Sequence, residues 1–337
     1  GDIMPDYQLL VIDFNHLCHR TFHSNYEMCT TDGVKTGVVF GVLRTLRMLS
    51  DTYKPDQVVF CKDIGQSFRR QIVESYKGSR GPKTDKEESD RTELYNQMDT
   101  AESMLNCLGV PVIHLHGLEA DDLCAVVVHM NPDKEILLMS GDKDFLQLIR
   151  PKVSWLNPNY DKIVSLDGWK AEDGLDHETF IHNYHKNKIV HPKTFTRKSE
   201  KLDNGIELDQ WLLYRSLVGD SSDELTGIVG IGEKTAAKIV SQCSTIDEVL
   251  SNKDSLKLSD RVKNNLTETD LKLQYNLIDL NLVVRSSIFP RIVEDVEKHL
   301  NVSNLLDHEL FQRMALNLQF TSILADFHQF IKNVPTS

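Results

Sequence analysis

With 337 residues, 40% of them hydrophobic, the chain is long enough for one large domain with a buried core and a second, smaller one. The formal net charge of −12 argues against a nucleic-acid binder unless many of the acids are gathered at one metal site. The six cysteines lack Cys-x-x-Cys spacing, and the sequence has no run of 18 apolar residues and no secretion leader. These features predict a reducing, intracellular environment and no membrane association.

An apolar run followed by acidic residues occurs three times in the first half of the chain. The runs cover residues 9–13, 57–63 and 135–144, and their acids are Asp13, Asp63, Asp142 and Asp144. Apolar residues with helical spacing separate the runs, at 38–49 and 94–108. Strands that alternate with helices predict a doubly wound α/β fold with a mainly parallel sheet. Ligands of such folds bind at the carboxyl ends of the strands, so these acids should converge.

The densest group of acids lies in Gly-Leu-Glu-Ala-Asp-Asp at residues 117–122, between two apolar runs. This order predicts a strand, a turn and a buried helix with Glu119, Asp121 and Asp122 in its first turn. Acids at this position are also ordinary helix caps, because the free N–H groups and the dipole favour negative charge. Together with the strand-end acids, however, they predict a site for Mg²⁺ or Mn²⁺, which prefer oxygen ligands. Paired ions about 4 Å apart suit phosphoryl transfer.

Two further segments carry groups suited to phosphate contact. Lys77 and Arg80, in Tyr-Lys-Gly-Ser-Arg, lie before the acidic helix and form either a solvated loop or the cations that meet a scissile phosphate. Residues 227–238 contain Gly230 and Gly232 and predict a helix, a glycine-rich hairpin and a second helix. Backbone N–H groups there would contact a nucleic-acid phosphate without reading sequence, although a plain turn between helices is the alternative.

Five motifs follow one another in a specific order. They are Val-Ile-Asp13, Phe-Arg69 with Tyr76-Lys-Gly-Ser-Arg80, Gly-Leu-Glu119-Ala-Asp-Asp122, Ser-Gly-Asp142-Lys-Asp144, and Gly-Asp220-Ser-Ser-Asp223 with Gly230-Ile-Gly232. In this order they closely resemble the flap endonuclease (FEN) superfamily, especially the 5′-nucleases of bacteriophages and of bacterial DNA polymerase I. The resemblance implies a PIN/FEN-like α/β fold with a helical arch and a helix-hairpin-helix region. It divides the chain into a nuclease core at 8–183 with its arch at 78–105, a basic insertion at 184–201, a DNA-binding region at 205–290 and a helical extension at 291–337.

The resemblance also implies a role for individual residues. Asp13, Asp63, Glu119 and Asp121 would hold a first metal ion, with Asp122 in support, and Asp121 would bridge to a second ion held by Asp142, Asp144, Asp220 and Asp223. Lys77 and Arg80 would act in catalysis with Asp121 and Asp142. Predicted DNA contacts are Arg69, Tyr76, Lys77, Arg80, Gly230, Gly232, Lys234, Thr235, Lys193, Arg197 and Lys198. The last three belong to the basic insertion, for which a plain surface loop is the alternative.

The implied function is that of a structure-specific, metal-dependent 5′-nuclease, both exonuclease and flap endonuclease, acting in primer removal or repair. Its substrates would be DNA with a 5′ single-stranded flap or end, and RNA–DNA hybrids. Its cofactors would be two to three Mg²⁺ or Mn²⁺ ions, with K⁺ at the hairpin. We also expect a monomer in the cytoplasm of a bacterium or a phage-infected host, with a replication protein bound at the C-terminal helices.

Two alternatives remain open at this point. A nuclease-fold protein could bind branched DNA without cutting it, although the nine acids argue against this. A PIN-like ribonuclease would share the acidic sheet edge but would not need Gly230 and Gly232. The spacing from Asp63 to Phe68 is about one residue shorter than the family pattern, so the assignment of Asp63 as a ligand is less direct. Because no polymerase follows in the sequence, we expect a stand-alone nuclease of the phage type.

Overall fold

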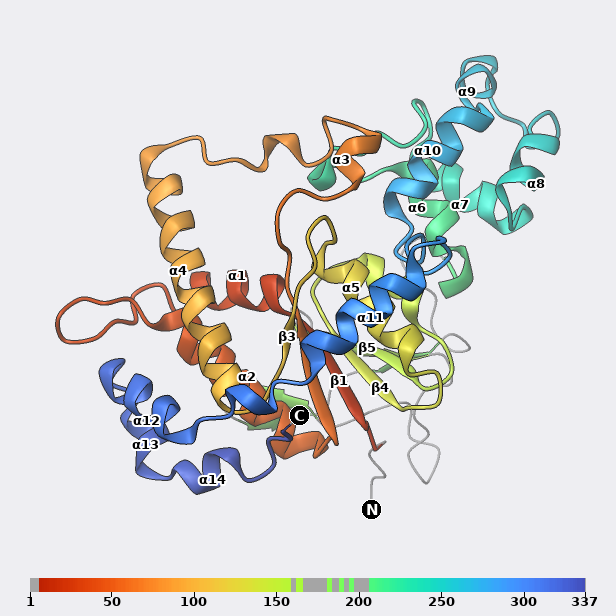
Figure 1. Cartoon of the computed structure of the whole chain (residues 1–337). Helices are drawn as coiled ribbons and strands as arrows, with labels where there is room; N and C mark the ends of the chain where they lie inside the picture. Colours follow the sequence, from red (N-terminus) through yellow and green to blue (C-terminus); the bar gives the residue numbers. More distant parts are fainter. Residues whose placement is uncertain are drawn as a thin grey trace.

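A mainly parallel β-sheet lies at the centre of the computed structural model, which describes residues 6–158, 162–165, 181–183, 188–190, 194–196 and 206–336 (Figure 1). The strands of this sheet within the described residues are β1 (Leu9–Asp13), β2 (Gln57–Cys61), β3 (Val112–Ile113), β4 (Ile136–Met139), β5 (Val153–Asn157), β6 (Lys162–Ser165) and β9 (Thr194–Thr196), in the order β3-β2-β1-β4-β5-β6-β9. Among the strand pairs of this sheet that the structure describes, β5–β6 is the only antiparallel one. A separate antiparallel pair joins β7 (Ile181–Asn183) to β8 (Lys188–Val190). The predicted α/β fold class is confirmed.

Both faces of the sheet are covered, which explains why its strands read as continuous apolar runs. In β1, Leu9 and Val11 pack on one side, and Leu10 and Ile12 pack on the other. The helices α5 (Ala120–Met130) and α11 (Phe289–Leu300) cover the first side. The second side is covered by α1 (Phe14–Ser24), α2 (Gly37–Tyr53) and α4 (Asp85–Cys107). Since β1, β2 and β4 run parallel, the acids that follow them meet at one edge of the sheet.

The segment predicted to form the arch, 78–105, contains the 3-10 helix η1 (Gly78–Arg80) and most of α4, and α3 (Arg69–Ile72) precedes it. In Figure 1 this orange segment extends from the neighbourhood of α6 and α10 across to the outer end of α4. The Thr84 side chain caps α4 by accepting the N–H of Glu87 at 3.1 Å. The buried residues of α4 begin at Leu94. Only the first part of α4 therefore projects from the core, and the predicted arch boundary at 105 includes a packed part of the helix.

A helical region follows the sheet, at the upper right of Figure 1. Its elements are η4 (Leu208–Gln210), α6 (Trp211–Val218), η5 (Ser221–Asp223), α7 (Glu233–Gln242), α8 (Ile246–Ser251), α9 (Asp260–Asn265) and α10 (Glu268–Ile278). The α6 helix packs against both α7 and α10. The glycine-rich turn at 227–232 leads directly into α7, as the sequence predicts.

The C-terminal extension is helical, as expected, and it packs on the nuclease core. After α11 come η6 (Ser303–Leu305), α12 (His308–Asn317), α13 (Thr321–Ala325) and α14 (Phe327–Ile331). Phe311, Phe320 and Phe330 from this part are buried on the α2–α4 side of the sheet. Packing against the core thus explains most of the apolar residues in the C-terminal extension. Leu306, Leu310 and Leu316 remain exposed, at 44%, 38% and 65%.

The predicted DNA contacts of the basic insertion, Lys193, Arg197 and Lys198, lie outside the described residues. Within the described part of the chain, no helix combines the length and the apolar composition needed to cross a bilayer.

Candidate metal centre

Asp13 and Asp63 are fixed at the carboxyl edge of the sheet. Asp13 ends β1 and caps α1, accepting the N–H of His16 at 3.1 Å and the hydroxyl of Ser140 at 2.8 Å. Asp63 follows β2, and its Oδ1 accepts the N–H of Ala120 at 2.5 Å. That hydrogen bond places Asp63 at the N-terminus of α5, beside the acids of that helix. Of the two predicted ligands, Asp63 thus lies at the start of α5, and Asp13 lies at the end of β1, the strand next to β2.

The first acidic group consists of Glu119, Asp121 and Asp122, whose carboxylate oxygens lie within 4.8 Å of one another. Arg69 partly neutralises this group: Nη1 lies 2.7 Å from both Glu119 and Asp122, and Nη2 lies 2.7 Å from the other oxygen of Asp122. Both oxygens of Asp122 are thus engaged, in agreement with a supporting role. The Arg69 side chain is only 1% exposed and also donates to the Leu277 carbonyl. The prediction that Arg69 contacts DNA is therefore wrong, because the buried guanidinium is committed to the protein.

Tyr76 is likewise buried, with 4% of its surface exposed. Its hydroxyl lies 3.2 Å from Glu119, and its ring packs with Leu225, Leu277 and Ile278. The predicted stacking of Tyr76 on a base is contradicted by this burial. The ring instead joins the segment before η1 to the helical region.

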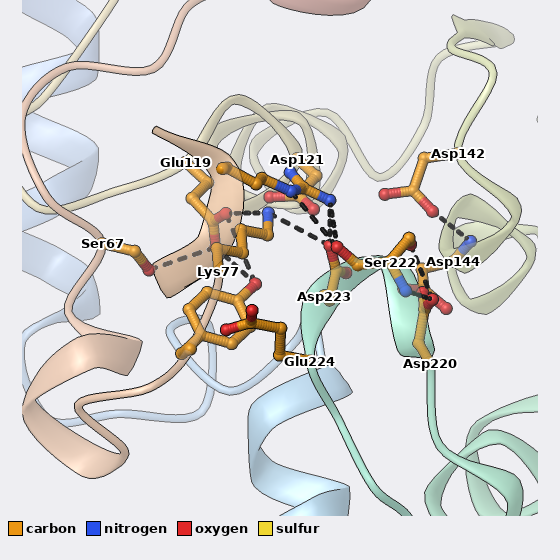
Figure 2. A network of polar contacts seen from close by, with 12 residues as sticks. Ser67, Lys77, Glu119, Asp121, Asp142, Asp144, Asp220, Ser222, Asp223 and Glu224 are labelled. Carbon is orange, nitrogen blue, oxygen red and sulfur yellow. Dashed lines mark hydrogen bonds and ion pairs between the residues drawn. The ribbon is translucent and has the colours of Figure 1, made fainter. Parts of the chain in front are cut away.

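The second acidic group consists of Asp144, Asp220 and Asp223, again with ligand oxygens within 4.8 Å of one another (Figure 2). Asp142 caps the 3-10 helix η2 (Lys143–Leu148) and accepts the N–H of Asp144 at 2.9 Å. Two side chains of α6 hold this group, and the sequence reasoning missed both. Arg215 Nη2 lies 2.7 Å from Asp220, and Trp211 Nε1 donates to Asp144 at 3.3 Å.

Lys77 lies between the two acidic groups, and Arg80 lies beside the second. The Lys77 ammonium forms an ion pair with Glu119 and lies 3.9 Å from Asp223. The Arg80 guanidinium forms an ion pair with Asp223. Figure 2 shows the Lys77 side chain reaching from Glu119 toward Asp223. The structure thus brings the two predicted cations and the acids of both groups together.

The charges of the site are poorly compensated by the protein alone. Burial, and then the nearby charges of Glu119 and Asp122, raise the pKa of Asp121. Burial, together with Asp223 and Asp13, raises the pKa of Asp142 to about 6. Burial would also raise the pKa of Glu119, but Lys77 and Arg69 outweigh it and lower that pKa. Carboxylates that resist ionisation in one cluster fit a site completed by cations, and an all-oxygen donor set suits hard divalent ions.

The predicted hairpin residues do not belong to this centre. Gly232 is the N-cap of α7, and Lys234 and Thr235 lie in its first turn. Gly230, Gly232 and Lys234 are exposed on the surface of the helical region. They form a separate candidate contact for a nucleic-acid backbone.

Only some of the residues that contact the acids could have been recognised from the sequence. Ser140 stands two residues before Asp142, and Arg215 stands about one helical turn before Asp220, so both are neighbours of predicted ligands. Ser67 Oγ donates to Glu119 at 3.1 Å across 52 residues of chain. No local pattern signals that contact.

We expect a divalent ion to stabilise the protein more at pH 7 than at pH 5. The pKa of Asp142 is raised to about 6, above its ordinary value of about 3.9. As the pH rises between these two pKa values, the Asp142 side chain loses its proton in the unfolded chain before it does so in the folded chain. The free energy of unfolding of the metal-free protein therefore falls. A bound ion removes this penalty and adds about 2.7 kcal/mol when its concentration is 100 times its Kd. Thermal unfolding with and without Mn²⁺ checks this, and an equal gain in Tm at both pH values would contradict it.

Comparison with known proteins agrees with this geometry. Residues 8–186 match a family model described as 5′-3′ exonuclease, N-terminal resolvase-like domain, and residues 206–298 match 5′-3′ exonuclease, C-terminal SAM fold. The chain is 30% identical to a 5′-3′ exonuclease of Bacillus subtilis over 288 residues, covering 83% of this chain and 86% of that protein. It is 26% identical to the thermostable DNA polymerase I of Thermus caldophilus over 331 residues, covering 96% of this chain. The chain spans 33% of the length of that polymerase.

A solved structure of similar fold is the T5 5′-exonuclease with bound zinc, with a TM-score of 0.64 and 19% identity, covering 87% of this chain and 99% of that chain. The resemblance identified from the five motifs is confirmed by the family models, the first of which alone covers more than half of the chain. The chain therefore belongs to the 5′-3′ exonuclease family.

Proposed function

We propose that this chain is a structure-specific 5′-nuclease that hydrolyses phosphodiesters near 5′ ends and 5′ flaps of DNA, using two or three Mg²⁺ or Mn²⁺ ions. The observation that carries the proposal is the placement of Lys77 between two acidic groups, with Arg80 paired to the second, each group having three carboxylates within 4.8 Å of one another. Acids alone would repel a phosphate. Two cations paired with these acids provide a place where a phosphodiester can lie next to both groups.

Each group of residues has a separate task in the proposed reaction. When bound, the divalent ions would activate the attacking water and stabilise charge on the attacking and leaving oxygens. Glu119 and Asp121 on one side, and Asp144, Asp220 and Asp223 on the other, provide the oxygens that would hold the ions. Lys77 and Arg80 would exchange their carboxylate partners for the scissile phosphate and offset its growing negative charge.

Duplex binding falls to the helical region in this proposal. Gly230, Gly232 and the first turn of α7 would contact the phosphate backbone, with K⁺ at the turn as a further part of the proposal. Lys193, Arg197 and Lys198 are proposed as additional DNA contacts. RNA–DNA hybrids as substrates, a replication protein at the exposed leucines of α12 and the cytoplasm of a bacterium or a phage-infected host complete the proposal.

The experiment compares 5′-labelled flap, nicked, duplex and single-stranded substrates in Mg²⁺ and reads product lengths. The proposal expects cuts near the junction of the flap and none in EDTA. DNA binding without cleavage in either Mg²⁺ or Mn²⁺ would support a non-cutting branched-DNA binder instead. Cleavage of single-stranded RNA alone would support the ribonuclease alternative.

Lys77→Ala is expected to lower the cleavage rate at saturating DNA by about 100-fold or more, as the loss of one fixed group at the developing charge does in other enzymes. DNA affinity should change far less, because Lys77 is proposed to act in the transition state. Single-turnover cleavage and metal-free binding separate the two effects. A change in affinity with an unaltered rate would make Lys77 a simple phosphate tether.

Gly232→Val is expected to weaken binding of duplex-containing flaps by about tenfold, while single-strand affinity stays unchanged, because losing one hydrogen bond to a charged phosphate costs about 1.5 kcal/mol or more. A Cβ at Gly232 would meet no atom within 4 Å, so the fold tolerates the change. Gly230 is a poorer test, because its φ is +95° and a Cβ there would lie 3.1 Å from Val262. Equal losses of affinity on both substrates would reject the role of the turn.

A further inference from the structure

Glu224 links the base of the arch segment to the second acidic group. Its Oε2 accepts the N–H of Gly78 at 2.9 Å, and its Oε1 accepts the N–H of Ser79 at 3.1 Å. Gly78 and Ser79 are the residues between Lys77 and Arg80, whereas Glu224 directly follows Asp223. The Glu224 carboxylate thus accepts hydrogen bonds from the backbone between the two cations. Glu224 itself belongs to the segment that contains Asp220 and Asp223 of the second acidic group.

The contacts of Glu224 differ in kind from those of its neighbours. Arg80 donates from Nε and Nη2 to the Ser222 carbonyl at 3.3 and 3.1 Å, and its guanidinium also pairs with Asp223. A divalent ion at Asp223 and a phosphate at Lys77 and Arg80 would compete for those side-chain pairs. The Glu224 bonds involve backbone N–H groups instead, so they are not among the side-chain pairs that a divalent ion or a phosphate at Lys77 and Arg80 would break. They can hold the segment in place while the cations change partners.

The backbone on both sides of this contact is unusual. Glu224 has φ 58° and Lys77 has φ 53°, both in the left-handed region that residues with long side chains seldom adopt. Such conformations persist where the surroundings fix them, and they concentrate at functional sites. The successive N–H groups of Gly78 and Ser79, converging on one carboxylate, form an anion-binding concavity. The chain uses this concavity for an internal ligand.

We propose that Glu224 is a positioning residue that holds Lys77 and Arg80 in line with the second acidic group, so that both cations meet the phosphate next to the metal ions. This inference rests on the proposed function, because it concerns the same cleavage step. Glu224 acts only through Lys77 and Arg80 and does not itself touch the substrate.

The test compares Glu224→Ala and Glu224→Gln with the wild type on a 5′-flap substrate in Mg²⁺. Glu224→Ala should lower kcat by about 10- to 100-fold, as small misplacements of catalytic groups do. Glu224→Gln keeps one acceptor oxygen and should lose less. For both variants, the DNA affinity without metal should stay within about twofold of the wild-type value, and Tm should stay within about 2 °C of it. Glu74→Ala is the matched control: this exposed glutamate lies between α3 and η1, and its carboxylate has no hydrogen bond or ion pair within the described residues. It should cleave like the wild type.

The double variant Lys77→Ala/Glu224→Ala separates positioning from a merely structural role. Because Glu224 is proposed to act through Lys77 and Arg80, the double variant should be slowed by clearly less than the product of the two single effects, whereas independent effects would multiply. Multiplied effects, or a wild-type kcat for Glu224→Ala, would overturn the inference. If Glu224→Ala lowers Tm, the Glu224→Gln variant replaces it in the test, and a wild-type kcat for Glu224→Gln would then overturn the inference. A wild-type protein that fails to cut flap DNA would instead reject the proposed function itself.

Discussion

Asp121→Asn is expected to lower the rate of DNA cleavage by about 1,000-fold or more. Asp121 belongs to the first acidic group and lies in the first turn of α5. Asparagine keeps the shape of the side chain but removes its charge. A loss of about 4 kcal/mol of charge stabilisation in the transition state corresponds to about 1,000-fold in rate. Single-turnover cleavage of flap DNA in Mg²⁺ measures the change, and binding without metal should be largely retained.

A matched control is Asp270→Asn, since Asp270 is an exposed acid in the first turn of another helix, α10. It should leave the cleavage rate unaltered. A wild-type rate for Asp121→Asn would mean that the first acidic group only caps its helix. Equal losses in both variants would show a general effect of charge rather than a metal centre.

Arg69→Ala is expected to lower the free energy of unfolding by about 3–5 kcal/mol, the usual cost of removing one partner from a buried ion pair. Arg69 is the cation that pairs with Glu119 and Asp122 at 2.7 Å, and its side chain is 1% exposed. Its removal leaves two buried carboxylates without that partner. Urea unfolding at pH 7 in EDTA measures the change.

Arg70→Ala serves as the control, because the neighbouring Arg70 is only partly buried, donates a long, exposed hydrogen bond of 3.4 Å to the Glu74 carbonyl, and interacts with Glu224 through its charge alone. Its effect on the free energy of unfolding should be within about 0.5 kcal/mol. If Arg69→Ala lowered the free energy of unfolding as little as Arg70→Ala does, the ion pairs of Arg69 would contribute little to stability. A stable Arg69→Ala protein with weaker DNA binding would restore the original prediction of a DNA contact.

The parts of the site that follow strands were predictable because they depend on local pattern. An apolar run of a few residues, then an acid, defines a buried parallel strand and its carboxyl end, and parallel pairing brings these ends together. Asp13, Asp142 and Asp144 converge for this reason. Asp63 departs from the family spacing, yet its hydrogen bond to Ala120 brings it to the same helix start. Its role as a ligand stays a prediction.

The residues that were misjudged depend on contacts between distant parts of the chain. Phe-Arg-Arg reads as a basic surface segment, and nothing local shows which arginine is buried. Arg69 turns inward because the carbonyl of Leu277, 208 residues away, and the acids of α5 surround it. Tyr76 is buried by the same α10 residues. The hydrogen bond between Glu224 and Gly78 likewise joins residues 146 positions apart, and no periodic pattern in the sequence predicts it.

The most direct test of the account is the position of Mn²⁺ ions, measured by anomalous X-ray scattering from crystals of the protein with flap DNA. We expect two peaks about 4 Å apart, one bound by Glu119 and Asp121 and the other by Asp144, Asp220 and Asp223. Lys77 and Arg80 should then contact the phosphate instead of Glu119 and Asp223. A lone peak away from both acidic groups, or none at millimolar Mn²⁺, would contradict a two-metal-ion nuclease.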